Sequence, residues 1–352
     1  MFVTALGTAT PPHCYTKSEC WDAFVKSEWF ERLTTRSRAI TRAVLQGDNG
    51  IETRFLAVEN LEEVFHIDPN TLQQRFELHA PRLASEAAAT ALERAGLRPE
   101  QIDAVIVSTC TGYLCPGLSG YVGEQLALRK NVRGYDMVGQ GCAAALPNWQ
   151  LASALLDSGQ CEHVLSICVE ICSAAMYLDD DPGVLISACL FGDGAGAAVL
   201  SRRRSGSGRA IQWRHTASLT DPVTRQALRF EQRDGLLRNV LSPAVPRLAA
   251  GYAHEVFLYV LATAQLQPAD VSTWIFHAGG RDVLLAIEQQ FALSSGAHRY
   301  SSDTLRLHGN LSSAFVYFVL EAALADNAPG GWWWMSSFGA GFSCHGALLS
   351  VD

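Results

Sequence analysis

The chain contains one local pattern twice, with corresponding residues about 169 positions apart. Residues 97–106 run from a helix end through a proline turn into an apolar strand, and residues 266–275 repeat that order. Further along, Cys142 follows a glycine and Asn310 follows another, and each opens an apolar stretch of helical length. The duplication predicts two similar halves of alternating strands and helices, and an active site divided between them.

The hydrophobic pattern supports this organisation along the whole chain. After a mixed helical region that ends near residue 78, it predicts helices at residues 80–95, 142–156, 245–262, 282–290 and 312–324. It predicts strands at residues 2–6, 104–109, 134–138, 164–169, 274–276, 334–338 and 346–351. A basic stretch rich in glycine and serine, residues 201–209, marks the seam. We therefore expect domains at residues 1–205 and 206–352.

Bulk properties limit the possible functions. The chain has 352 residues, of which 48% are hydrophobic, which suffices for two fused halves around a large core. Its formal net charge of −8 argues against general nucleic-acid binding. The sequence has no long apolar run and no basic secretory segment, so we expect a cytoplasmic protein without a membrane partner. The ten cysteines lack the short spacings of a zinc site, which predicts reduced core residues and no metal.

Cys142 is the candidate nucleophile. Gly141 before it allows a sharp bend from strand to helix, which would place the thiol at the first turn, beside unpaired N–H groups and the positive end of the helix dipole. Such surroundings, with an imidazole nearby, lower a cysteine pKa from about 8.5 to roughly 3.5–7.5. The alternative for Cys142 is a small buried hydrophobic residue in an alanine-rich helix.

His277 and Asn310 complete the candidate site. His277 ends a repeated strand and precedes Gly279 and Gly280, where the backbone can approach a ligand closely. Taken alone, His277 fits a structural role and Asn310 fits a helix N-cap. Together with Cys142 they form a Cys/His/Asn set, in which the asparagine amide cannot act as a base but can donate to an oxyanion. That chemistry suits acyl transfer through a thioester and the loss of CO₂ to give an enolate.

These motifs resemble the type III polyketide synthases, the chalcone synthase-like family of the thiolase superfamily, over essentially the whole chain. The segments that carry the resemblance are residues 7–12, 50–55, 140–142, 190–195 and 309–314, together with His277 and its glycines. Cys110 is more typical of bacterial members. The resemblance implies an α/β thiolase fold, a five-layer αβαβα sandwich of duplicated halves, in a homodimer whose subunits each hold a complete triad.

The resemblance also implies roles for the triad. Cys142 would carry the starter and the growing chain, while His277 and Asn310 would hold thioester carbonyls and promote decarboxylation of malonyl-CoA. His277 would also keep Cys142 ionised. We expect an acyltransferase that condenses malonyl-CoA iteratively onto an acyl-CoA starter by decarboxylative Claisen chemistry and then cyclises the chain. CoA thioesters would be substrates, and no metal or redox cofactor would be needed.

Further residues are candidates for the substrate cavity. Phe191 matches a gatekeeping phenylalanine, although core packing also explains it, and Cys110 would line the cavity or act as a second catalytic thiol. Cys115 falls where the family lines its cavity and reaches across the dimer interface. Gly339 and Gly341 belong to a C-terminal loop that is closer to ketoacyl-ACP synthase III than to plant polyketide synthases.

Two departures from the family leave details open. The second gatekeeper of plant members should lie near residues 235–238, where this chain has Arg238 or a neighbour instead of phenylalanine. The cations that would bind CoA phosphates are not identified, although Arg36, Arg38 and Arg42 are available. Two alternatives remain: a ketoacyl-ACP synthase III-like enzyme that condenses once, and a catalytically silent scaffold protein. The starter, the number of extensions and the product are not encoded in a readable motif.

Overall fold

The structure, a computed structural model, describes residues 1–204 and 208–352. The predicted domain boundary falls on residues 205–207, which lie outside the described residues, so the division at residues 205 and 206 stays a prediction. The remaining ends of the predicted seam are Ser201, where a strand ends, and Arg209, which donates hydrogen bonds to the carbonyls of Asp352 and Ala328.

A nine-stranded sheet in the order β11-β12-β13-β8-β1-β7-β6-β4-β5 runs through both halves. Its strands are β1 (Phe2–Ala9), β4 (Ala104–Ser108), β5 (Arg133–Met137), β6 (His163–Glu170), β7 (Gly194–Ser201), β8 (Ile211–Thr220), β11 (Val271–Phe276), β12 (Gly331–Gly339) and β13 (Ser343–Val351). β1 pairs along its length with β7, and only Phe2 and Val3 pair with β8 of the other half. The two half-sheets are therefore joined at one corner.

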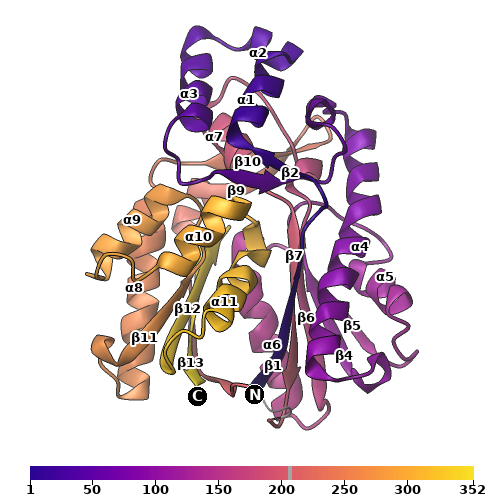
Figure 1. Cartoon of the computed structure of the whole chain (residues 1–352), viewed down its shortest axis with the longest axis vertical. Helices are drawn as coiled ribbons and strands as arrows, with labels where there is room; N and C mark the ends of the chain where they lie inside the picture. The colour runs from indigo at the N-terminus through magenta and orange to yellow at the C-terminus, as the bar shows by residue number, and fades with distance from the viewer. Residues whose placement is uncertain (205–207) are drawn as a thin grey trace.

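Helices on the sheet faces complete the layers, as Figure 1 shows. α4 (Pro69–Ala95) packs on β1 and β7, and α8 (Val245–Ala264) packs on β13 and β8 with α9 (Arg281–Gln290) beside it. Between the half-sheets lie α6 (Ala145–Asp157) and α11 (Phe315–Ala325). This arrangement confirms the predicted five-layer sandwich of duplicated halves.

The two central helices are largely buried because most of their residues are apolar. One buried polar contact joins them: the Trp149 indole donates to the Tyr317 hydroxyl at 3.0 Å, and that hydroxyl lies 3.0 Å from Ser166 of β6. Buried polar groups need such partners, so these contacts fix how α6 and α11 cross. This core positions the turns at the beginnings of both helices, which carry the candidate residues Cys142 and Asn310.

α4 is longer than its apolar stripe predicted. The Asp68 side chain accepts a hydrogen bond from the Thr71 amide at 3.0 Å, and Pro69 occupies the first turn, so the helix begins eleven residues before the predicted residue 80. Its alanines pack directly on the sheet, and the backbone of Gly7 lies so near that an added Cβ would be 2.2 Å from the Ala87 carbonyl oxygen. A glycine is therefore needed at position 7 because α4 packs so closely on β1, and not because the Gly7 backbone has an unusual conformation.

Several elements were not predicted. They are α5 (Leu118–Gln125), α7 (Pro182–Leu190), α10 (Arg299–His308), the strands β7 and β8, and the hairpin of β9 (Leu228–Arg233) and β10 (Leu236–Leu241). The mixed helical region contains α1 (Lys17–Val25), α2 (Glu28–Arg32) and α3 (Thr35–Gln46), with the short strands β2 (Cys14–Thr16) and β3 (Thr53–Phe55). These helices and the β9–β10 hairpin lie at the same end of the molecule (Figure 1). Within the described residues, no helix is long and apolar enough to cross a membrane.

Replacing Gly7 by alanine should destabilise the protein by about 1–3 kcal/mol, because the new methyl group would force α4 away from β1. As a control, Gly251→Ala in α8 adds a methyl group with no described atom within 4 Å and should leave stability equal or slightly higher. Urea unfolding of both variants measures the difference. Equal free energies of unfolding for Gly7→Ala and wild type would contradict the close packing.

Candidate active site

Cys142 lies in the turn that leads from β5 into α6. Gly141 adopts a φ of +54°, which glycine tolerates best, and Cys142 follows in the 3₁₀ turn Gly141–Ala143. The end of β12 packs on this turn: a Cβ on Gly339 would lie 2.5 Å from the Gln140 carbonyl oxygen. The second half of the chain therefore holds the candidate nucleophile of the first half in place.

Asn310 occupies the matching position before α11. Its side-chain oxygen accepts a hydrogen bond from the Ser312 amide at 2.9 Å, as in an Asx turn, and its amide donates to the Gly279 carbonyl at 3.2 Å. An asparagine amide carries two N–H groups, so the bond to Gly279 leaves one available for a substrate. Asn310 thus stabilises the turn before α11 and retains a free donor.

His277 directly follows β11, and its backbone N–H donates to the Ser336 carbonyl of β12 at 2.9 Å. The imidazole is buried between the rings of Phe315 and Phe338, with centroid distances of 5.4 and 4.9 Å. Neither ring nitrogen has a hydrogen-bond partner among the described residues. A buried imidazole without partners is costly, so its nitrogens are expected to act on a bound molecule.

Ser312 connects the three candidate residues. Its hydroxyl lies 3.3 Å from the Cys142 sulfur, and its backbone N–H binds Asn310, which in turn binds the glycine loop after His277. In the described part of the chain, no hydrogen bond joins Cys142 directly to His277 or Asn310. The structure thus brings the residues into one connected network, and their convergence on a reacting carbon stays a prediction.

Glu170, at the end of β6, is the main polar residue that the sequence analysis missed. Its carboxylate is fully buried and accepts hydrogen bonds from Thr111 at 2.9 Å, the Cys110 amide at 3.0 Å, Ser312 at 3.2 Å and Ser313 at 2.5 Å. These donors come from both halves of the chain. The available signal was an acid closing the apolar segment His163–Glu170, a position that a buried strand rarely gives to a carboxylate.

Burial sets the charge state of the candidate pair. It raises the pKa of Cys142 to about 12, with the Ser312 hydrogen bond acting in the opposite direction and Glu170 raising it further. Burial also lowers the pKa of His277 to about 3. The structure therefore gives the opposite direction from the predicted low thiol pKa. Either charge alone is disfavoured here, so a reactive thiolate requires that a base take up the thiol proton as the sulfur attacks.

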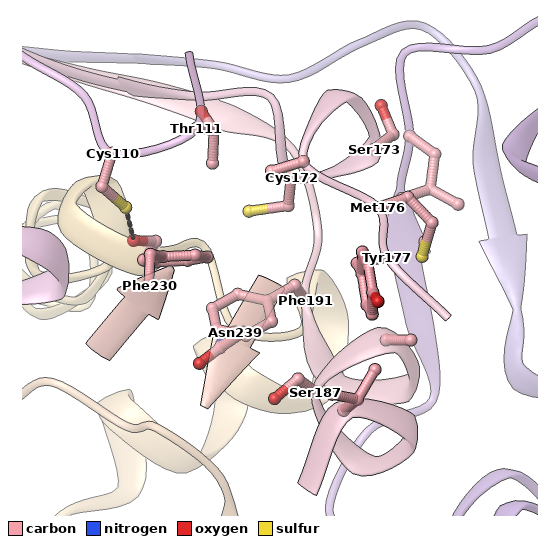
Figure 2. A pocket seen from close by; sticks show the side chains of 15 residues that line it. Cys110, Thr111, Cys172, Ser173, Met176, Tyr177, Ser187, Phe191, Phe230 and Asn239 are labelled. Carbon is pink, nitrogen blue, oxygen red and sulfur yellow. Dashed lines mark hydrogen bonds between the residues drawn. The ribbon is translucent and has the colours of Figure 1, made fainter. Parts of the chain in front are cut away.

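A cavity of about 40 Å³ lies beside this network and is drawn in Figure 2. Cys110, Phe191, Phe230, Asn239 and Ser312 are among its lining residues. A larger cavity of about 500 Å³ shares Cys110 and Phe230 with it and extends to Gly141, next to the candidate nucleophile. Phe230 and Cys110 therefore stand between a small inner space and a wide outer one.

The other residues predicted to line the cavity lie in different parts of the site. The Cys110 sulfur lies 3.3 Å from the Ser312 hydroxyl and 3.4 Å from Glu170, whose negative charge adds to burial in raising the Cys110 pKa. Cys115 is exposed and lines neither cavity, so its position across a dimer interface stays a prediction. Gly339 packs on the Cys142 turn, and Gly341, with a φ of +131°, follows Ala340 of the outer cavity.

Arg238 does not face the cavity. Its guanidinium forms ion pairs with Asp179 at 3.0 Å, Asp181 at 3.2 Å and Glu231 at 3.1 Å. Because side chains alternate along a strand, the next residue of β10, Asn239, lies on the opposite face and lines the inner cavity. Asn239, and not Arg238, therefore lies on the cavity wall near the position expected for the second gatekeeper.

The candidate phosphate ligands lie on α3. The guanidinium of Arg38 donates to the Phe30 carbonyl at 3.0 Å, and that of Arg42 lies 5.4 Å from the Trp21 ring centroid, while Arg36 is exposed. A role for any of them in holding CoA stays a prediction. Among the described residues, no group of three or more His, Cys, Asp or Glu side chains could hold a metal ion.

Comparisons with known proteins agree with this fold. Residues 37–219 match the FAE1/Type III polyketide synthase-like protein family, and residues 261–351 match the C-terminal domain of 3-oxoacyl-[acyl-carrier-protein] synthase III. The chain is 30% identical to 1,3,6,8-tetrahydroxynaphthalene synthase of Streptomyces peucetius subsp. caesius over 99% of this chain and 92% of that one. It is 27% identical to 3,5-dihydroxyphenylacetyl-CoA synthase of Streptomyces toyocaensis over 99% and 89%.

Solved structures show the same fold. The 1,3,6,8-tetrahydroxynaphthalene synthase of Streptomyces coelicolor A3(2) superposes with a TM-score of 0.88 at 22% identity, covering 99% of both chains. PKS-I of the brown alga Ectocarpus siliculosus gives a TM-score of 0.90 at 24% identity, covering 99% of this chain and 98% of that one. The fold is the thiolase fold. Among proteins with this fold, the chain belongs to the type III polyketide synthase family and is an acyltransferase-type enzyme.

Replacing Ser312 by alanine should slow alkylation of Cys142 by iodoacetamide at pH 9 by about tenfold, because a lost hydrogen bond to the thiolate raises the thiol pKa by roughly one unit. Peptide mass spectrometry can follow Cys142 separately from the other cysteines. Ser313→Ala is the matched control, because that hydroxyl binds Glu170 rather than the sulfur. Equal alkylation rates in Ser312→Ala and wild type would show that Ser312 does not stabilise the thiolate.

Proposed function

We propose that an acyl-CoA starter is transferred to Cys142 and that malonyl-CoA then extends it iteratively before cyclisation. The observation that supports this most is the placement of Cys142 and Asn310 at the beginnings of two matching helices, linked through the hydroxyl and amide of one residue, Ser312. A nucleophile and an oxyanion donor held at fixed separation are what thioester chemistry requires. The names of the curated relatives, two synthases of aromatic products, support a cyclising condensation.

Loading begins with a neutral thiol. The Cys142 sulfur attacks the thioester carbonyl of the starter while its proton passes to His277, which supplies a buried nitrogen without a partner. The tetrahedral oxyanion is stabilised by the free N–H of Asn310 and by the histidine. Collapse of the intermediate breaks the bond to the CoA sulfur, which takes up a proton and leaves, and the starter remains bound to Cys142.

Extension uses the same donors a second time. Asn310 and His277 hold the thioester carbonyl of malonyl-CoA, so the electron pair released with CO₂ is accommodated on an enolate oxygen. The enolate carbon attacks the starter thioester, the bond to the Cys142 sulfur breaks, and the lengthened chain remains on CoA. Transfer back to Cys142 permits another cycle. We propose that no redox cofactor takes part, because neither step transfers electrons to or from an external carrier. We propose that no metal takes part either, because Asn310 and His277 supply the groups that stabilise the oxyanion and the enolate.

The direct test incubates the protein with malonyl-CoA and short, aromatic and long-chain acyl-CoA starters and identifies products by mass spectrometry. Wild type should form cyclised polyketides, and Cys142→Ala should lower product formation at least a thousandfold by removing the nucleophile. Cys161→Ala is the control, because this buried cysteine belongs to the hydrophobic core. Product formed equally by Cys142→Ala and wild type would contradict the proposal.

The rival function is a single condensation onto acyl carrier protein. It is favoured by one observation, the match of residues 261–351 to the synthase III C-terminal domain. The same assay distinguishes the two functions, since a strict requirement for acyl carrier protein would support the rival. A catalytically silent protein would release no CO₂ from malonyl-CoA and would take up no acyl group.

We also propose that the enzyme is a cytoplasmic homodimer. Among the described residues, β5 is an edge strand whose backbone lacks a partner on one side, and Val138 next to it and Tyr113, which lines the outer cavity with Val138, are 65% and 69% exposed. We expect sedimentation equilibrium to give a mass near twice the 38.2 kDa of the chain. A monomer at micromolar concentration would contradict this assembly.

A further inference from the structure

The β9–β10 hairpin presents two different faces. Asn239 of β10 is paired with Phe230 of β9, and both line the inner cavity. The next pair along the hairpin, Arg238 and Glu231, forms an ion pair and lies on the opposite face. Figure 2 shows Asn239 on the cavity wall with Phe230 and Phe191 nearby.

Asn239 is a buried polar residue without a partner. It is 9% exposed, its side-chain oxygen is fully buried, and neither polar atom of the carboxamide makes a hydrogen bond to any residue that the structure describes. Removing an amide from water without replacing its hydrogen bonds is unfavourable. A residue with this cost on a cavity wall indicates a ligand group that supplies the missing bonds.

The serine and threonine hydroxyls of the same cavity are already engaged, whereas the Tyr177 hydroxyl, like the Asn239 carboxamide, makes no hydrogen bond to a described residue. The Ser312 hydroxyl binds Cys142 and Glu170, the Ser173 hydroxyl binds Asp193, and the Ser187 hydroxyl binds the Gly183 carbonyl. The rest of the lining is mostly apolar and includes Phe191. Asn239 is therefore well placed to give this cavity polar specificity.

We propose that the Asn239 carboxamide binds an oxygen of the growing chain and so determines how far extension proceeds. This inference rests on the proposed function, in which the chain carries a keto group at every second carbon. An amide can donate to a keto oxygen and can accept from the corresponding enol hydroxyl, so Asn239 fits either form. A purely hydrocarbon tail would leave both amide atoms unpaired, and the cavity therefore selects a keto-bearing chain.

The ion pairs of Arg238, on the opposite face of the hairpin, hold the strand that carries Asn239 in place. Asp179 and Asp181 lie just before and at the N-terminus of α7, so the guanidinium fastens β10 to that helix. Holding Arg238 fixes the backbone of its neighbour and hence the direction of the Asn239 side chain. Arg238 is a positioning residue in this account, because it contacts no part of the cavity.

The test compares Asn239→Leu with wild type on malonyl-CoA and an accepted starter, measuring acylation of Cys142, release of CO₂ and the ratio of full-length to shorter products. Leucine has nearly the same size but cannot hydrogen-bond. We expect acylation and the first decarboxylation to change less than twofold and the product ratio to fall at least tenfold, since a hydrogen bond lost from a buried site is worth about that factor. Val240→Leu, one residue further along and outside the cavity lining, should match wild type.

The remaining outcomes are distinguishable. An unchanged product ratio in Asn239→Leu, an equal change in Val240→Leu, or a parallel loss of Cys142 acylation would overturn the inference. If Asn239→Leu does not fold by circular dichroism, Asn239→Ser keeps a hydrogen-bonding group in less volume and should retain more full-length product than Asn239→Ala. Absence of any polyketide from wild type would instead refute the proposed function. Arg238→Lys should preserve the ratio better than Arg238→Ala.

Discussion

The buried carboxylate of Glu170 is the interaction on which the arrangement of the site depends. It accepts hydrogen bonds from the loop after β4 in the first half and from the two serines before α11 in the second half. A buried carboxylate is stable only when donors surround it, so both segments must approach it together. Because Ser312 is one of these donors and also contacts Cys142, the position of the candidate nucleophile follows from the same requirement.

The divided site follows from the duplication of the fold. Each half supplies a turn and a buried helix at equivalent places, and divergence has put a thiol in one turn and a carboxamide in the other. The Trp149–Tyr317 hydrogen bond at 3.0 Å holds the two helices together through their buried faces. The halves can therefore present two chemical functions to one space with little freedom of movement, which is the pre-organisation that oxyanion stabilisation needs. The same burial keeps the thiol and the imidazole uncharged until they act together.

Much of this fold could be predicted from the sequence because its core elements are strongly periodic. The repeated segments at residues 97–106 and 266–275 indicated the two halves, and the helix at residues 80–95 was correct apart from its start. Cys142, His277 and Asn310 were predicted as a triad because they occupy recognisable glycine-flanked turns, and their shared catalytic role stays a prediction. The β9–β10 hairpin was missed because its strands carry charged residues on one face and form a separate two-stranded sheet.

Contacts between distant segments were beyond the reach of the sequence. No residue close to Glu170 in the sequence indicates that Ser312, 142 positions away, would donate a hydrogen bond to it. The orientation of the hairpin determines that Asn239, rather than Arg238, lines the cavity. That orientation depends on strand pairing and on the ion-pair partners Asp179 and Asp181, which no local sequence pattern reveals. The charge state of Cys142 likewise depended on how completely the surrounding halves exclude water, which the helix-dipole argument did not include.

The central claim is that this network makes Cys142 the acyl carrier. The most direct measurement is peptide mapping by mass spectrometry after brief incubation of the protein with an acyl-CoA starter and rapid acid quenching. The account predicts a thioester adduct on the peptide that contains Cys142. An adduct on Cys110 instead, or none on any cysteine under conditions in which product forms, would contradict it.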